Sequence, residues 1–265
     1  MYDFANQPYT TLIITFIYST FFTKVIAINE IEGTALWSRA MAITALAVAF
    51  LSPIMGAIAD RGGYRKLFLM FWTYVCIIGS FALYFPLPGE IYKALFWVVI
   101  SNIGFEMGGV FCNAYLPDIA PENKIGRVSG YGWSFGYLGG LMALLIGYIL
   151  LVSPETPIFG FSKDLGENIR ATNLMVGIWF LLFSIPVFIG VQEKKKENKS
   201  NLKNIWMGSF GQIQTTFKNI REYKELVKFL IARLFYNDGL VTIFAFGGIY
   251  AAGTFGFTFE DIFLF

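Results

Sequence analysis

Long apolar runs alternate with short polar connections along most of the chain. A helix needs about 20 apolar residues to cross the hydrocarbon core of a bilayer. Six runs meet this length without difficulty, and a seventh does so with Arg233 and Asp238 in its first third. The predicted spans are residues 5–27, 40–59, 67–89, 94–117, 128–154, 171–192 and 229–259. The pattern therefore predicts an all-α integral membrane protein.

The composition agrees with this prediction. Of the 265 residues, 56% are hydrophobic and 14% are charged, whereas a soluble domain has about 25% charged residues. The formal net charge is +2, so the chain has no strongly basic field. These values exclude a soluble enzyme, a disordered chain and a nucleic-acid-binding protein.

Residue types that support catalysis or metal binding are scarce. The chain has no histidine, and its two cysteines, Cys76 and Cys112, lie singly in separate apolar runs. Histidine-based triads, histidine metal sites and imidazole proton shuttles are thereby excluded, and the spacing of the two cysteines supports no redox or zinc role. We expect no catalytic residues, no metal site and no cofactor, and hence a protein that is not an enzyme.

The distribution of basic residues predicts the topology. Of the 20 Lys and Arg residues, 14 lie in the connections after even-numbered spans and 5 in those after odd-numbered spans. Loops rich in Lys and Arg stay on the cytoplasmic side of a membrane. The N-terminus and the even-numbered connections are therefore predicted to be cytoplasmic.

The connection between the second and third spans carries a recognisable motif. Residues 56–66 read GAIADRGGYRK, which resembles the GxxxDRxGRRK signature of the major facilitator superfamily at the place where that family carries it. Tyr64 is the one departure, because the family usually has a basic residue there. Gly63 permits a turn with positive φ.

The resemblance also implies a role for the charged residues of this motif. In the superfamily, this loop is understood to latch the two halves of the carrier together on the cytoplasmic side. Carried over, Asp60, Arg61 and Arg65 would be gating residues and not substrate ligands. The alternative is that they only anchor the topology on the anionic cytoplasmic face.

Four further stretches narrow the resemblance. Residues 2–6, 113–120, 130–140 and 235–239 resemble the UMF1/Atg22-like branch of the superfamily. This implies secondary transport of a small solute across a lipid bilayer by alternating access. The best-known eukaryotic relatives are linked to amino-acid efflux from vacuoles. We therefore expect a multi-pass protein of the plasma (inner) membrane, or of the vacuolar membrane in a eukaryote.

The resemblance also sets the expected domain organisation. Family members have twelve spans in two six-helix halves. Residues 1–192 are predicted to form the complete N-terminal half, and residues 226–265 the start of the C-terminal half, with span seven and the approach to span eight. The chain would then lack most of its second half, which is expected in the full-length protein. Residues 193–225 are predicted to be a cytoplasmic linker with an amphipathic helix, whose apolar stripe is Trp206, Phe210, Ile213, Phe217 and Ile220.

The fourth span is interrupted by one charged residue, Glu106. At 100° per residue, Asn102, Glu106, Gly109 and Asn113 fall within about 60° of one another. A charge inside a transmembrane helix costs a few kcal/mol and is therefore a functional candidate. We predict that Asn102, Glu106 and Asn113 line the substrate or proton pathway, where Glu106 titrates or binds an amino group. The alternative is a hydrogen bond between helices that serves packing.

Polar residues also gather at the predicted cytoplasmic ends of the first and seventh spans. Here we predict further residues of a cytoplasmic gate, in which Arg233 could pair with an aspartate, or alternatively simple anchors of the helix ends. The residues are Asp3, Asn6, Arg233, Asn237 and Asp238.

Glycines of the fifth span form a stripe with a spacing that favours close helix packing. Its members are Gly132, Gly136, Gly140 and Gly147. A packing role is favoured over any direct contact with substrate.

Two other classes of protein remain as alternatives to a transporter. A seven-span receptor has the same number of spans, but its N-terminus would lie outside, and a retinal protein would need a lysine in the seventh span. A non-transporting membrane subunit would have no need of the polar stripe in the fourth span.

Overall fold

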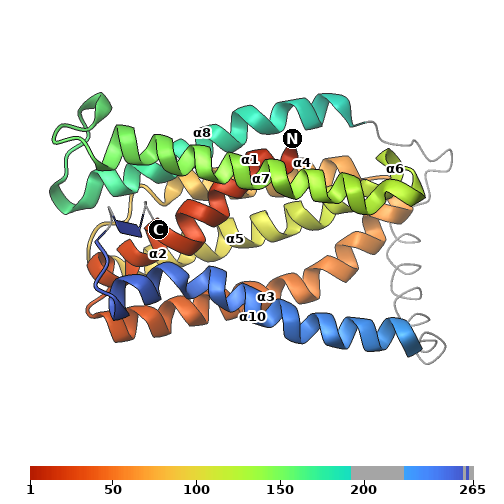
Figure 1. The fold of residues 1–265 in the computed structure, drawn as a ribbon, viewed down its shortest axis with the longest axis horizontal. Helices are drawn as coiled ribbons and strands as arrows, with labels where there is room; N and C mark the ends of the chain where they lie inside the picture. The colour runs from red at the N-terminus through yellow and green to blue at the C-terminus, as the bar shows by residue number, and fades with distance from the viewer. Residues whose placement is uncertain (192–223, 259–260, 263–265) are drawn as a thin grey trace.

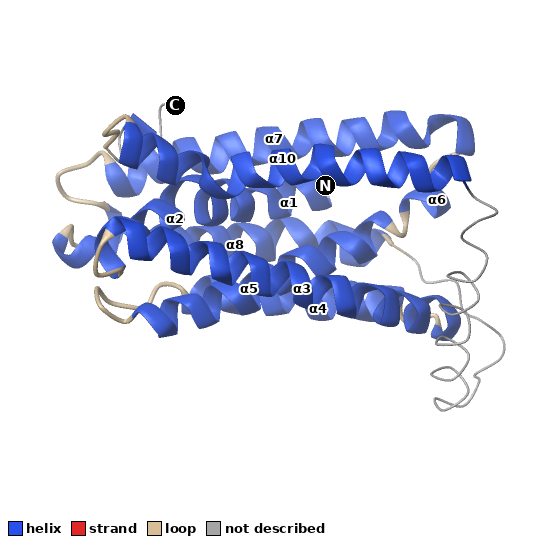
Figure 2. Ribbon diagram, turned by 90° about the horizontal axis from the view of Figure 1, so that it is seen from below, coloured by secondary structure: helices blue, strands red, loops and turns tan. Residues whose placement is uncertain are grey.

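The computed structural model describes residues 1–191, 224–258 and 261–262, except for the side chain of Arg61. Within these ranges, all regular elements are helices, and seven segments are long and apolar enough to cross a membrane. The seven segments lie side by side along one direction (Figure 1, Figure 2). The seven predicted spans are therefore confirmed, while the predicted amphipathic helix at 193–225 lies almost wholly outside the described residues.

The bounds of the elements are as follows. The first span is continuous and consists of α1 (Tyr2–Pro8), a π-helix (Tyr9–Phe16), α2 (Ile17–Phe21) and a second π-helix (Phe22–Ile26). The next spans contain α3 (Glu30–Gly62), α4 (Arg65–Ala82), α5 (Ile91–Asn113) with the short α6 (Leu116–Ile119), and α7 (Ile125–Gly147), which continues as a π-helix (Tyr148–Val152). The last two long helices are α8 (Glu167–Gly190) and α10 (Lys224–Thr254), and 3-10 turns occupy Glu122–Lys124, Ile158–Gly160 and Asp164–Gly166.

Several predicted span limits need correction. The seventh span is the helix Lys224–Thr254 and does not run from 229 to 259. The helix of the second span begins at Glu30, ten residues before the apolar run, because the Asn29 side chain caps it by accepting a hydrogen bond from the Glu32 N–H at 2.8 Å. The third span ends at Ala82 and not near residue 89, since the two prolines of segment 83–90 do not suit a continuing helix. Hydropathy alone does not reveal these limits.

The sixth span also starts earlier than predicted. Its helix α8 begins at Glu167, so Arg170 belongs to the helix and its side chain is buried. A count of loop charges places this arginine in a connection, and that placement is wrong.

The first span runs through the middle of the six-helix assembly. Most of its residues are buried, including Tyr9, Tyr18 and Phe22. The Tyr2 hydroxyl shares a 2.7 Å hydrogen bond with Thr73 of α4, and the Tyr9 hydroxyl shares one of the same length with Ser101 of α5. Buried hydroxyl groups need such partners, and here the partners fix the first span against α4 and α5.

Glycines allow several of these helices to touch backbone to backbone. A Cβ atom on Gly104 of α5 would lie 2.6 Å from the backbone nitrogen of Cys76 in α4. A Cβ on Gly139 of α7 would lie 2.5 Å from the carbonyl oxygen of Phe4. Small residues at helix contacts are the usual means of close packing in membranes. The helices are therefore held by close contact of their main chains.

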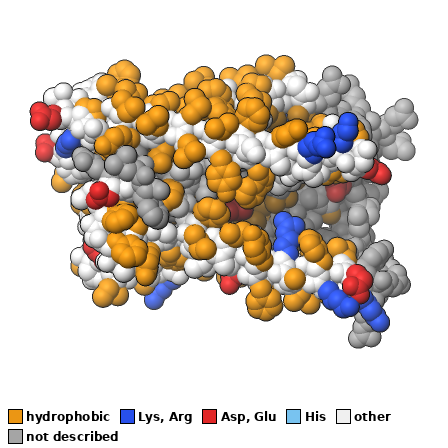
Figure 3. All heavy atoms as spheres, viewed as in Figure 1, with side chains coloured by type: hydrophobic (Ala, Val, Ile, Leu, Met, Phe, Trp, Pro, Cys, Tyr) orange, Lys and Arg blue, Asp and Glu red, His pale blue; other side chains and the backbone are white. Residues whose placement is uncertain are grey.

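The two ends of the bundle are named here by one residue each. The Arg65 end, at the right of Figure 1, contains the start of α4, the helix α6 and the start of α10. The Lys24 end, opposite it, contains the end of the first span and the end of α10. Between them, hydrophobic side chains cover much of the surface in Figure 3. Such a surface matches the hydrocarbon core of a bilayer.

Candidate transport pathway and gate

The polar face of α5 divides in the structure. Glu106 and Asn113 are exposed, and the space around Gly109 is open, since a Cβ atom there would meet nothing within 4 Å. Asn102 is instead buried, with its amide nitrogen 3.6 Å from the sulfur of Met41 on α3. The structure therefore keeps Glu106 and Asn113 on one open face and turns Asn102 toward a neighbouring helix.

Glu106 lies beside an aromatic stack that belongs to the first span and α5. The rings of Tyr9 and Phe105 are stacked with centroids 5.1 Å apart, and the Tyr9 hydroxyl is committed to Ser101. Within the part of the chain that the structure describes, the Glu106 carboxylate has no hydrogen bond or ion pair. It is the kind of group that a cation or a proton could neutralise.

The motif between α3 and α4 forms a charge cluster at the Arg65 end. The guanidinium group of Arg65 donates from Nε to Asp60 Oδ1 at 2.7 Å, with Nη2 2.6 Å from the same oxygen, and from Nη1 to Asp118 Oδ2 at 3.1 Å. Gly63 has φ +68° and ends α3 in the left-handed conformation, as the motif predicts. Arg65 thus ties the end of α3 to α6.

Asp118 is a residue that the sequence analysis did not select. It lies on α6, more than fifty residues from Arg65, and only the fold brings the two together. The adjacent Lys66 donates from Nζ to the carbonyl oxygen of Val191 at 2.9 Å, just beyond α8. The motif therefore joins four elements at this end of the bundle, while the predicted contribution of Arg61 lies outside the described side chains.

Asp3 and Asn6 lie in α1, at the start of the first span. Asp3 packs directly on Gly132 of α7, and a Cβ atom on Gly136 would lie 3.2 Å from its Cβ. Asn6 is buried. Asp3 also lines a pocket of about 320 Å³, together with Asn113 and Gly132. The structure therefore brings Asp3 and Asn113 to a common hollow.

The predicted glycine stripe packs as expected. Gly132 and Gly136 lie against Asp3, and a Cβ atom on Gly140 would lie 2.7 Å from the hydroxyl oxygen of Thr11. Gly147 is buried farther along the same helix. These positions agree with a packing role against the first span.

The remaining predicted gate residues lie on an exposed stretch of α10. Arg233, Asn237 and Asp238 are all exposed, and the Asp238 carbonyl oxygen accepts a hydrogen bond from Thr242. Among the ion pairs of the described residues, none joins Arg233 to Asp3 or Asp238. A gating role for these residues stays a prediction.

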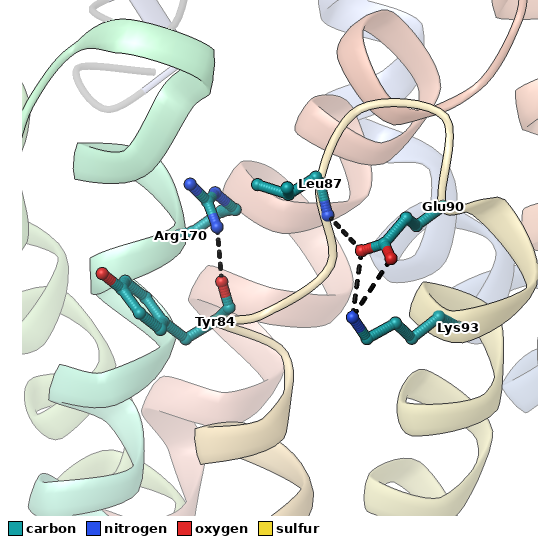
Figure 4. A network of polar contacts seen from close by, with 5 residues as sticks. All are labelled: Tyr84, Leu87, Glu90, Lys93 and Arg170. Carbon is teal, nitrogen blue, oxygen red and sulfur yellow. Dashed lines mark hydrogen bonds and ion pairs between the residues drawn. The ribbon is translucent and has the colours of Figure 1, made fainter.

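A second polar network lies at the Lys24 end and was not foreseen (Figure 4). The buried Arg170 donates from Nη1 to the carbonyl oxygen of Tyr84 at 2.8 Å, and its guanidinium lies 5.4 Å from the centroid of the Tyr84 ring. The Tyr84 hydroxyl donates to Glu167 at 2.6 Å, which raises the pKa of Tyr84. The Asn173 amide nitrogen donates to the carbonyl oxygen of Leu83 at 3.2 Å. One face of α8 therefore grips the start of segment 83–90.

The far side of the same segment is held by Glu90. Its carboxylate accepts a hydrogen bond from the Leu87 N–H at 2.9 Å and lies 3.0 Å from Lys93 Nζ. Both contacts favour the ionised form and lower the pKa of Glu90.

Within the described residues, no group of three potential metal ligands among Asp, Glu and Cys lies together.

Comparison with known proteins decides the family. A model described as "Vacuole effluxer Atg22 like" matches residues 23–127 and 122–265. The chain belongs to the Atg22-like branch of the major facilitator superfamily. A similar protein is the uncharacterized MFS-type transporter YxiO of Bacillus subtilis, 31% identical over 92% of this chain and 56% of the relative. Autophagy-related protein 22 of Yarrowia lipolytica is 22% identical over 75% of this chain and 45% of the relative.

The solved structures support the same fold. A partially occluded inward-open structure of the xylose transporter XylE from E. coli is similar to the Atg22-like chain with a TM-score of 0.58. It is 15% identical, and the match covers 99% of this chain and 66% of XylE. An inward-open XylE structure gives a TM-score of 0.53 with 17% identity, over 83% of this chain and 54% of XylE.

These matches confirm several expectations. The Atg22-like chain is a multi-pass membrane protein of a transporter family and not an enzyme, and a seven-span receptor is no longer an alternative. It spans about half the length of the curated relatives it matches.

Proposed function

We propose that the full-length Atg22-like protein is a secondary active carrier that moves small solutes across its membrane by alternating access. The observation that supports this proposal is the position of Glu106. Its carboxylate lies on the open face of α5 without a partner among the described residues, and the fold is similar to that of a known sugar carrier. An ionisable group inside a membrane span that faces an open space typically belongs to a substrate or proton pathway.

The proposed substrate is an amino acid or a similar small solute that leaves a compartment. Glu106 can bind the ammonium group of such a solute, or exchange a proton with the pathway as the carrier changes conformation. Asn113 lies two turns farther along the same open face and offers an amide for hydrogen bonding. Asn102, which is turned toward Met41, would reach the pathway only if α3 moved away from α5.

The proposed orientation places the N-terminus and the Arg65 end in the cytoplasm, in a plasma (inner) membrane or a vacuolar membrane. The excess of Lys and Arg in the even-numbered connections supports this orientation. The proposed organisation comprises residues 1–192 as one half, 193–225 as a linker and 226–265 as the start of the second half. The second half would complete the wall of the pathway.

The charge cluster at the Arg65 end is proposed to serve as the cytoplasmic gate. Arg65 holds Asp60 and Asp118 within this half, which fixes the ends of α3 and α6 at the mouth of the pathway. Arg61 belongs to the same proposed gate. On the first span and on α10, the proposed gate residues are Asp3, Asn6, Arg233, Asn237 and Asp238.

The test is transport by the full-length protein in liposomes preloaded with a mixture of amino acids. Glu106→Gln keeps the size of the side chain and removes its charge, and we expect it to abolish efflux and any coupled proton movement. Glu122→Gln, at an exposed position outside the long helices, is the matched control and should transport normally. Equal efflux by both variants at equal insertion would refute the role of Glu106. Lack of efflux by the unaltered protein across the whole mixture would favour a non-transporting subunit.

A further inference from the structure

The C-terminal part of α10 packs against the middle and the end of the first span, mainly against the π-helix Tyr9–Phe16 and α2. Its buried positions are Ala245, Gly248, Ala251 and Ala252, whereas most residues before 244 are exposed. At 100° per residue, Asn237 points within about 20° of the direction of Gly248. The face that is packed at one end of α10 therefore continues, unpacked, toward the Arg65 end.

Gly248 is the point of closest approach. A Cβ atom there would overlap the carbonyl oxygen of Thr15 and lie 2.8 Å from the Cα of Phe16. All three nearest atoms belong to backbone, so a side chain could not be accommodated by rotation of a neighbour. The adjacent Gly247 differs sharply, because a Cβ atom there would meet nothing within 4 Å. Contact between these helices therefore requires glycine at 248 and not at 247.

Lys24 makes the second contact between the two segments. Its Nζ donates to the carbonyl oxygen of Ala252 at 3.1 Å. Because α10 ends at Thr254, this carbonyl belongs to the last turn, where helical carbonyl groups lack intrahelical donors. A cation at a helix C-terminus satisfies such groups and is favoured by the helix dipole. Lys24 is thus a cap, supplied by the first span, for the end of α10.

The first span is itself held in place close to Lys24. The Gly89 N–H donates to the carbonyl oxygen of Ile26 at 3.0 Å, which ties segment 83–90 to the end of the first span. The other side of that segment is gripped by Arg170 and Asn173 of α8. The end of the first span is therefore a fixed support within the six-helix half, against which α10 can close or part.

We propose that Lys24 and Gly248 form the closure at the Lys24 end and set the balance between its closed and open states. The proposal rests on the function proposed above, in which the two halves of the carrier move against each other. Gly248 allows α10 to pack closely against the first span. Lys24 is a positioning residue that stabilises this packed arrangement by capping α10. Both contacts must part when this end opens.

The test measures opening without any substrate. In full-length protein in nanodiscs, with all native cysteines replaced by Ala, Cys76 and Cys112 among them, an Ala251→Cys substitution places a single thiol at a buried position of α10. Its rate of reaction with a water-soluble maleimide reports the population of the open state, since the thiol reacts when α10 parts from the first span.

Removal of the cap should raise the labelling rate. We expect Lys24→Met to increase it about fivefold to tenfold, as loss of a cation at a helix C-terminus predicts. Lys24→Arg, which keeps the charge, should stay near the parent rate. Lys163→Met, which removes an exposed lysine at the same end, should leave the rate unchanged.

The glycine pair gives an independent arm. Gly248→Val should raise the labelling rate at least as much as Lys24→Met, and Gly247→Val should not change it. The proposal is overturned if Lys24→Met and Gly248→Val both label at the parent rate, or if the two control variants label as fast as they do. Because labelling needs no substrate, a failure of the Glu106 transport test would leave this result standing, and the reverse also holds.

Discussion

Substitutions at two glycines of α5 should have different effects, one on stability and the other on transport. A Cβ atom on Gly104 would lie 2.6 Å from the backbone nitrogen of Cys76 and 2.9 Å from the carbonyl oxygen of Trp72, whereas one on Gly109 would meet nothing within 4 Å. Gly104→Val must therefore push α4 and α5 apart, while Gly109→Val adds a side chain to open space beside Glu106.

The expected change in unfolding free energy follows from these contacts. Overpacking a close helix contact costs about 1–3 kcal/mol, and both groups that Gly104 faces are backbone and cannot rotate away. We therefore expect about 2 kcal/mol of destabilisation for Gly104→Val. In a protein of this size that corresponds to a fall in Tm of roughly 4–8 °C. For Gly109→Val we expect a change of less than about 0.5 kcal/mol.

The assay has two parts, thermal unfolding in detergent and transport per correctly inserted molecule of the full-length protein. Gly104→Val should unfold earlier yet transport normally below its Tm. Gly109→Val should unfold like the parent yet transport more slowly, because it narrows the open face. Equal Tm values for the two variants would refute the packing argument, and normal transport by Gly109→Val would remove the open face from the pathway.

Two further predictions concern charged groups outside the bilayer core. A double-mutant cycle of Arg65→Gln and Asp118→Asn should give a coupling free energy of about 0.5–1 kcal/mol in thermal unfolding, and this coupling should weaken in high salt because the pair is partly exposed. Zero coupling at low salt would contradict the ion pair between Arg65 and Asp118. The pKa of Glu90 is lowered in the folded protein, so its stabilising effect should be present above the ordinary glutamate pKa and lost as the pH falls through the lowered value. The Tm difference between the parent and Glu90→Gln should therefore be larger at pH 7 than at pH 3, and a difference that grows on acidification would contradict the assigned contacts.

Hydropathy and motif spacing predict most of this fold for simple physical reasons. A bilayer demands long apolar helices, so each span is visible as a run of residues, and the glycine at position 63 can be assigned to a turn because few residues adopt positive φ. The glycine stripe of α7 is similarly readable, since its spacings of four and seven residues correspond to about one and two helical turns. The limits of the spans are less visible, as Asn29 shows by starting a helix ten residues before its apolar run.

The candidate site is only partly readable from the sequence. A helical wheel places Asn102 beside Glu106, but it does not show where a neighbouring helix lies, and α3 in fact covers Asn102. The partnership of Arg65 with Asp118 joins residues 53 positions apart, and no local pattern encodes it. The sequence suggests a loop position for Arg170, because a charged residue is rarely buried. Its burial depends on the carbonyl oxygen and the aromatic ring of Tyr84, which only the fold brings to it.

The contacts of glycine distinguish the parts of this structure that hold together from the part that can move. Within the assembly of the first six spans, Gly79 and Gly104 between α4 and α5, and Gly136 and Gly139 between α7 and the first span, allow close approach of the helices. Such contacts are short-range and numerous, and parting them would cost dispersion energy at several places at once. Between α10 and the first span, the close approach at Gly248 and the lysine cap at Ala252 lie in the last third of α10, and most of the helix before residue 244 is exposed. A carrier that moves as two rigid bodies would part along that weaker contact. For this reason, the labelling rate at Ala251→Cys should respond to Lys24→Met and Gly248→Val and not to substitutions within the assembly of the first six spans.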